Sequence, residues 1–383
     1  MRFTFFTGIC ALATLSLPLV TIKQNRIVSG EDLRIFELHP LFGVAAVIYL
    51  GVLFYIVLRR RANAVNFLAA ACIFMVLILG AVWSVHTSLA EWDSTGYGRI
   101  SFAGGFWFFL LTLYLFLSYS HRESGSARVR QLSIAVPLLI FFFFSIIGLF
   151  ENTAIAMEFV NHQKKFLREL LQHLYLSLTA VGTAAIIGIP AGIKAARSER
   201  WRDPIFKIVS GIQTVPSLAL FGLMIAPLAA LSSAFPVLRT MGIAGIGTAP
   251  ALIALGLFAL LPVIRNTFTG IMEIESQVRS AALGMGMNRR QIFRYIELPL
   301  AAPLVLTGIR ISLVQSIGNT AVAALIGAGG LGTFIFQGLG QSVPDLILLG
   351  VIPVILLSVL MDRLFYAGEL IATPKGVRAA WQS

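Results

Sequence analysis

Residues 280–299, SAALGMGMNRRQIFRYIELP, form a charged stretch between two long apolar runs, and this stretch decides how the chain is arranged. A charged side chain at the centre of a bilayer costs at least about 2.5–3.5 kcal/mol, so these residues must leave the hydrocarbon. Apolar residues recur among them at roughly helical spacing, while arginines supply a wet and basic side. The apolar positions include Leu283, Met287, Ile292 and Ile296. This pattern predicts an amphipathic helix that docks another protein.

The composition of the whole chain indicates a membrane protein. Hydrophobic residues are 57% and charged residues 12% of 383 residues, and the mean hydropathy is +0.87. A water-soluble domain with one core could hardly tolerate these values. We therefore expect an all-α integral membrane protein with about ten transmembrane helices, since each crossing takes about 20 apolar residues. The expected spans are 4–22, 40–58, 64–85, 102–119, 131–150, 173–193, 205–230, 248–269, 301–325 and 345–366.

The distribution of basic residues predicts the orientation of the chain. The net charge of +12 suggests nucleic acid as a partner, but about twenty of the twenty-nine lysines and arginines fall in alternate loops. Cytoplasmic loops carry this excess. We expect a multi-pass protein of the bacterial inner membrane, in contact with lipid and not nucleic acid, with both termini cytoplasmic. The basic residues include Arg59 to Arg61. For Arg310, inside a span, snorkelling is favoured over a structural role facing the bundle.

The chain divides near residue 150 by composition. Residues 1–150 are rich in Phe and Leu and are expected to form an accessory N-terminal membrane module of about five helices. The positively charged start and the first apolar run also fit a secretory signal peptide, although an uncleaved first helix is favoured. Residues 151–172 are a polar external connecting segment. Residues 173–370 are dense in Gly, Ala and Pro, which allow close helix packing and hinges, and are expected to form the working core; 371–383 is a cytoplasmic tail.

Residues that would indicate catalysis or a bound metal do not form a recognisable motif. There is no HExxH, no paired-cysteine metal motif and no Gly-Lys dipeptide, so the chain lacks a Walker loop for ATP. Cys10 and Cys72 are expected to be packing residues. The run 327–332 matches GxGxxG, but it follows an apolar span, so a helix break is favoured over a dinucleotide site. Five dispersed histidines are expected at interfaces: His39, His86, His121, His162 and His173.

The charged stretch resembles the coupling motif of ABC importer permeases, written EAA, three residues, Gly, nine residues, Ile, one residue, Leu-Pro. The matching positions are Ala281, Ala282, Gly286, Ile296, Leu298 and Pro299. Ser280 stands where the motif has Glu. Residues 173–181, 211–224, 284–310 and 321–340 resemble permeases of osmoprotectant importers, which carry glycine betaine, choline, carnitine or proline betaine. The resemblance covers about 160–370, and the long N-terminal extension is similar to a low-affinity betaine-type form.

The resemblance implies a type I ABC importer permease core with a cytoplasmic coupling helix near 279–292. In that family the helix rests on a separate ATPase subunit, which binds ATP and Mg, and the permease itself binds no cofactor. A periplasmic or extracytoplasmic binding protein delivers the solute, and a second permease copy or paralogue completes the pathway, which works by alternating access. The ATPase-coupling residues implied are Ser280, Ala281, Ala282, Gly284, Gly286, Met287, Asn288, Arg289, Arg290, Ile296, Leu298 and Pro299.

Two further groups of residues are candidates for the transport pathway. Polar residues within apolar runs are candidates to line the path, although interhelical hydrogen bonding explains them equally well. They are Gln213, Thr214, Gln315, Ser316, Asn319 and Thr320. The glycines of the predicted break are candidates for an outer gate, and a simple loop is the alternative. They are Gly327, Gly329, Gly330 and Gly332.

Other functions stay open at this point. The solute of the importer could instead be another small polar molecule, such as an amino acid. An ATP-independent secondary transporter would normally need buried acidic residues for ion coupling, and the expected core spans contain almost none. A membrane enzyme or sensor built on the first five spans has no reactive cluster to support it.

Overall fold

The computed structural model describes residues 2–26, 29–58, 64–92, 98–124 and 126–373. The chain forms two compact units, Met1–Asn161 and His162–Ser383. The basic residues Arg59 to Arg61 and the predicted tail beyond residue 373 lie outside the described residues.

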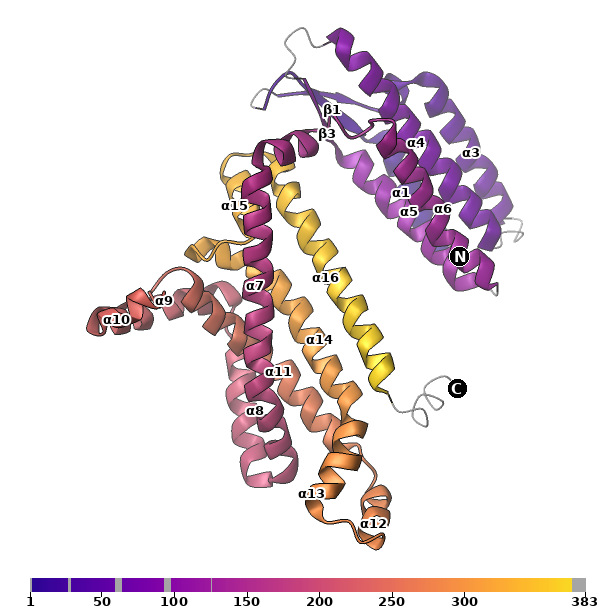
Figure 1. The fold of residues 1–383 in the computed structure, drawn as a ribbon. Helices are drawn as coiled ribbons and strands as arrows, with labels where there is room; N and C mark the ends of the chain where they lie inside the picture. The colour runs from indigo at the N-terminus through magenta and orange to yellow at the C-terminus, as the bar shows by residue number, and fades with distance from the viewer. Residues whose placement is uncertain (1, 27–28, 59–63, 93–97, 125, 374–383) are drawn as a thin grey trace. The chain divides into compact units, whose positions relative to one another are not determined.

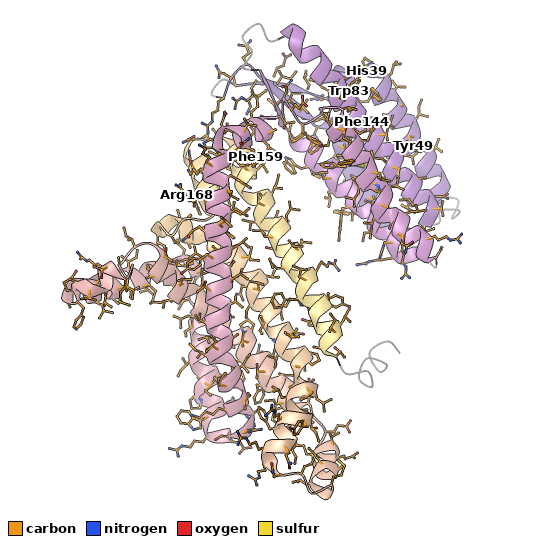
Figure 2. The ribbon with its side chains drawn as sticks, in the orientation of Figure 1. His39, Tyr49, Trp83, Phe144, Phe159 and Arg168 are labelled. Atoms are coloured by element: carbon orange, nitrogen blue, oxygen red, sulfur yellow. The ribbon has the colours of Figure 1, made fainter. Side chains whose placement is uncertain are left out.

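The N-terminal unit is a bundle of helices (Figure 1). Its core is rich in aromatic side chains. Phe67, Phe74 and Phe109 are almost fully buried, and the rings of Phe74 and Phe109 lie 5.8 Å apart. Figure 2 labels Tyr49, Trp83 and Phe144 on the same bundle. Its helices are α1 (Arg2–Ser16), α2 (Ile35–Leu38), α3 (Pro40–Leu58), α4 (Ala64–Trp92), α5 (Gly104–Glu123) and α6 (Ala127–Ile146).

A small antiparallel sheet joins this bundle and was not predicted. Strands β1 (Val20–Lys23), β2 (Glu31–Leu33) and β3 (Arg99–Phe102) lie in the order β2-β1-β3, with Val20 opposite both Leu33 and Phe102. The predicted first span, 4–22, is therefore wrong at its end, because α1 stops at Ser16. Pro18 cannot continue a helix, and the β-branched residues after it favour a strand.

The second unit consists of long helices joined by short ones (Figure 1). Helix α7 (Ala154–Arg197) enters it through a kink at His162, whose φ and ψ are −121° and 15°. The other helices are α8 (Glu199–Thr214), α9 (Ser217–Ala234), α10 (Pro236–Thr240), α11 (Thr248–Met272), α12 (Ser276–Gly284), α13 (Arg289–Ile292), the π-helix η1 (Phe293–Glu297), α14 (Leu298–Ala323), the 3₁₀-helix η2 (Ala324–Ile326), α15 (Gly332–Gly340) and α16 (Pro344–Ala372).

Among the described residues, seven helices are long and apolar enough to cross a membrane. They contain Ala64–Val85, Arg128–Ile146, Ala154–Arg197, Ser217–Ala234, Thr248–Met272, Arg289–Ile326 and Pro344–Ala372. The predicted span 205–230 is wrong, because it is two helices, α8 and α9, separated at Val215 and Pro216. The residue before a proline is driven away from helical backbone angles, and Val215 has an extended ψ of 127°.

Small residues let the helices of the second unit approach closely, as the composition predicted. A Cβ on Gly308 of α14 would lie 2.8 Å from the Pro262 carbonyl oxygen of α11. A Cβ on Gly188 of α7 would lie 2.9 Å from Val263, also on α11. The Ser312 hydroxyl donates to the Ala259 carbonyl at 2.8 Å. Helices α7, α11 and α14 thus pack closely against one another at small residues.

Candidate functional site

The charged segment, residues 280–299, is not the single amphipathic helix predicted. Helix α12 ends at Gly284, Gly286 adopts a left-handed φ of 81°, and a new helix begins at Arg289. The side chains of Asn288 and Gln291 each accept a hydrogen bond from the other's backbone N–H, at 2.9 and 2.8 Å. This reciprocal cap is a recognised helix start. The segment is therefore a helix–turn–helix, and the spacing Asn-x-x-Gln was the signal that could have revealed it.

Most of the predicted coupling residues lie on the surface of this helix–turn–helix. Ala282 is buried, and Met287 and Ile296 are half-buried. Leu283 and Met285, both large and apolar, are 57% and 72% exposed between the basic positions. The remaining predicted residues are exposed: Ser280, Ala281, Gly284, Gly286, Asn288, Arg289, Arg290, Leu298 and Pro299. The result is a protruding surface with apolar and basic groups, at the lower end of Figure 1.

A buried carboxylate lies beneath this surface and was missed by the sequence reasoning. Glu297 is 8% exposed, and its two oxygens accept hydrogen bonds from Arg197 Nη2 and Arg279 Nε, each at 2.9 Å. Arg279 Nη2 also donates to the Ile271 carbonyl at 2.6 Å. The Arg197 guanidinium packs over the Phe293 ring, 4.3 Å from its centroid. We call Glu297, Arg197 and Arg279 the ionic node.

The predicted path residues are divided between two places. Gln213, at the end of α8, donates through Nε2 to the Phe258 carbonyl of α11 at 2.9 Å, whereas the exposed Thr214 bonds to Gly211 within its own helix. On α14 the Thr320 hydroxyl donates to the Ser316 carbonyl at 2.7 Å. Four path residues share α14: Ser316 and Thr320 are buried, Asn319 is half-buried and Gln315 is exposed. Interhelical bonding accounts for Gln213, and a path role for the six stays a prediction.

The glycine run 327–332 is a helix break, as predicted, and it follows a 3₁₀-helix and no strand. Gly327, Gly329 and Gly330 all have left-handed φ angles, between 76° and 88°. A Cβ on Gly332 would collide with the Ala321 carbonyl oxygen. These backbone angles and this close approach require glycine. Residues 327–332 are called the glycine loop below.

Three polar residues of α7 hold the glycine loop. Glu169 Oε2 accepts from the Gly330 N–H at 2.8 Å, and Gln172 Nε2 donates to the Ala328 carbonyl at 2.9 Å. His173 Nδ1 accepts from the Leu331 N–H at 3.3 Å, and Nε2 faces the Ile317 carbonyl at 3.0 Å. We call Glu169, Gln172 and His173 the polar clamp.

The polar clamp overturns the prediction for His173, and one of its members, Glu169, also forms an ion pair with Arg168. The prediction that His173 is interfacial is wrong, because it is fully buried. Arg168 marks this part of α7 in Figure 2, and its Nη2 lies 3.2 Å from Glu169 Oε1. Because a buried polar group needs a partner, the clamp fixes the conformation of an otherwise permissive loop.

Snorkelling was the favoured interpretation of Arg310, but the structure shows its guanidinium paired with carboxylates of a neighbouring helix. Its Nε lies 3.1 Å from Glu369 Oε1 and its Nη1 3.8 Å from Asp362 Oδ1, both on α16. The Tyr366 ring lies 5.6 Å from the guanidinium carbon. Arg310 therefore joins α14 to α16, the bundle-facing structural role.

The second unit is thus a bundle of apolar helices with a protruding turn of basic and apolar side chains. Residues 184–368 match the family described as binding-protein-dependent transport system inner membrane component. Residues 2–156 match the N-terminal domain of the ABC transporter permease YehY. The chain belongs to the family of ABC importer permeases. It is a multi-pass protein of the inner membrane and is not itself an enzyme.

The related proteins align with a little more than half of the chain. The osmoprotectant import permease OsmW of Salmonella typhimurium is 39% identical over 207 residues, 54% of this chain and 91% of that protein. The carnitine transport permease OpuCB of Listeria monocytogenes is 38% identical over 227 residues, 59% of this chain and 97% of that protein. The glycine betaine/carnitine/choline permease OpuCB of Bacillus subtilis is 35% identical, covering 54% and 88%. A methionine ABC transporter in an inward-facing conformation gives a TM-score of 0.47 at 21% identity, covering 55% of this chain and 96% of that chain.

Proposed function

We propose that this chain is the membrane permease of an ATP-driven importer for an osmoprotectant such as glycine betaine or choline. The observation that carries this proposal is the similarity to permeases named for osmoprotectant, carnitine and glycine betaine/carnitine/choline transport, at 35–39% identity over nearly their whole length. The low-affinity form is proposed on the long N-terminal unit, which matches a domain of the permease YehY.

The charged segment is proposed as the docking surface for an ATPase subunit. It exposes large apolar residues among arginines, and such a surface suits a protein partner. The ATPase binds ATP and Mg, an extracytoplasmic binding protein delivers the solute, and a second copy or a paralogue of the permease completes the path. Both termini then lie in the cytoplasm, on the side of the ATPase. Closure of the ATPases moves the docking surfaces and opens the path alternately to the two sides.

The test is solute uptake by the reconstituted transporter. The chain is placed in proteoliposomes with the ATPase and the binding protein encoded beside it, and radiolabelled glycine betaine, choline and methionine are offered separately. We expect accumulation of a quaternary ammonium solute that requires both ATP on the ATPase side and the binding protein. Uptake of methionine alone would change the solute to an amino acid. Uptake driven by an ion gradient without ATP would refute the importer.

A further inference from the structure

We propose that Glu297 is a positioning residue of the transport cycle, which converts movement of helix α12 into movement of α7 and α14. The inference rests on the proposed docking of the ATPase on the charged segment. It assigns a role to Glu297, the buried acid of the charged segment, and to the two arginines that it pairs with.

The ionic node joins three helices and the end of a fourth. Glu297 immediately precedes α14, Arg279 is on α12, and Arg197 is the last residue of α7. Arg279 also caps α11 by donating to Ile271, one residue before that helix ends. Glu297 is the last residue of η1, within the continuous helical run Arg289–Ile326, and Arg197 lies at the C-terminus of α7, where the helix dipole favours its positive charge.

Helix α12 is separated from its neighbouring helices by a break at each end, so its side-chain contacts connect it to them. Its N-cap is Glu275, after an interruption that follows α11, and the left-handed Gly286 follows its other end. Ala282 is its buried residue. A helix between two breaks moves together with its neighbours only where side-chain contacts connect it to them. The charge-assisted bonds from Arg279 to Glu297 and Ile271 hold α12 to the helices beside it.

The helices held by the ionic node reach the glycine loop at their other ends. Helix α14 has 26 residues and leads through η2 into that loop. Helix α7 carries Arg197 at one end and the polar clamp about 36 Å away, at 1.5 Å per residue from His173. That distance exceeds the roughly 30 Å hydrocarbon thickness of a bilayer. A displacement of Glu297 therefore acts on both helices that shape the glycine loop.

Neutralising Glu297 removes the common partner of two guanidinium groups. Arg197 and Arg279 are one-half and one-third exposed, so water can solvate them and the fold can survive. The link between α12 and α7 is then lost, while the exposed docking surface keeps its residues. ATP hydrolysis would continue without productive movement of the path.

The test compares Glu297→Gln with the matched control Glu273→Gln in the reconstituted complex. Glu273 is an exposed carboxylate at the end of α11, outside the ionic node. We expect Glu297→Gln to retain binding-protein-stimulated ATP hydrolysis while uptake per ATP falls about tenfold, within the 5–150-fold range of ordinary coupling. Glu297→Asp should recover part of the ratio. Glu273→Gln should match the wild type.

A double-mutant cycle and a crosslink separate the possible outcomes. Arg279→Gln combined with Glu297→Gln should lower uptake per ATP by less than the product of the two single effects, because the two residues share the Arg279–Glu297 bond. Met287→Cys should crosslink to the ATPase in all variants. An unchanged uptake-to-ATP ratio in Glu297→Gln, or a parallel fall of uptake and hydrolysis, would overturn the inference. If a complex whose only change is Met287→Cys never crosslinks to the ATPase, the proposed docking is refuted, and the inference with it.

Discussion

At the scale of single residues, Gly332 is the position where the backbone leaves least room. Its Cα faces the Ala321 carbonyl so closely that an added methyl group collides with it. Gly340, at the other end of the same helix, has no atom within 4 Å of an added Cβ. We expect Gly332→Ala to destabilise the protein by about 1–3 kcal/mol through overpacking, and Gly340→Ala to change it little. Thermal unfolding of the two purified variants in detergent checks this, and equal unfolding temperatures would contradict it.

Contacts between residues that are distant in sequence could not be predicted from the single sequence. Arg197 and Glu297 are 100 positions apart, and each has an ordinary explanation as a charged residue near a helix end. Glu169 and Gly330 are 161 positions apart. Only the packing of α7 against α14 and the glycine loop brings such groups together. The exposed residues of the charged segment were predictable, because their motif is local.

At the scale of elements, the turn between α12 and α13 depends on the left-handed backbone of Gly286. An added Cβ there meets nothing within 4 Å, so backbone strain and not crowding limits substitution. The left-handed conformation costs a typical residue about 1–2 kcal/mol, but Asn adopts it more readily. We expect Gly286→Val to uncouple uptake from ATP hydrolysis and Gly286→Asn to retain coupling. Equal uptake per ATP in the two variants would exclude a role for this conformation.

Element prediction succeeded where hydropathy and local chemistry agree. Apolar runs gave the long helices α4, α11, α14 and α16, and the glycine run gave the break after α14. It failed where a short element continues an apolar run, because hydropathy alone does not distinguish helix from strand. The run from α1 into β1 was predicted as one span, although Pro18 separates them. The break at Pro216 was lost in the same way, between the apolar residues of α8 and α9.

At the scale of the whole molecule, the two units match two different families. The match to the permease family lies within 184–368, and the match to the YehY domain lies within 2–156. The relatives named for osmoprotectant and carnitine transport align over 91–97% of their own length with only 54–59% of this chain. Those proteins are almost fully accounted for by about half of this chain. Because residues 2–156 have a family match of their own, we interpret the N-terminal unit as an addition to the permease core.

This addition predicts that the second unit alone supports coupled transport. A chain beginning at residue 154 keeps the whole of α7, and with it the polar clamp and Arg197 of the ionic node. We expect it to keep ATP-dependent uptake per ATP within about fivefold of the full chain, because a coupling change below about 1 kcal/mol shifts a ratio by less than about fivefold. Purified truncated and full-length complexes are compared for uptake and hydrolysis in the same proteoliposomes. If a properly assembled truncated complex hydrolyses ATP but no longer transports, the N-terminal unit is part of the coupling machinery, because the ionic node and the glycine loop are both still present.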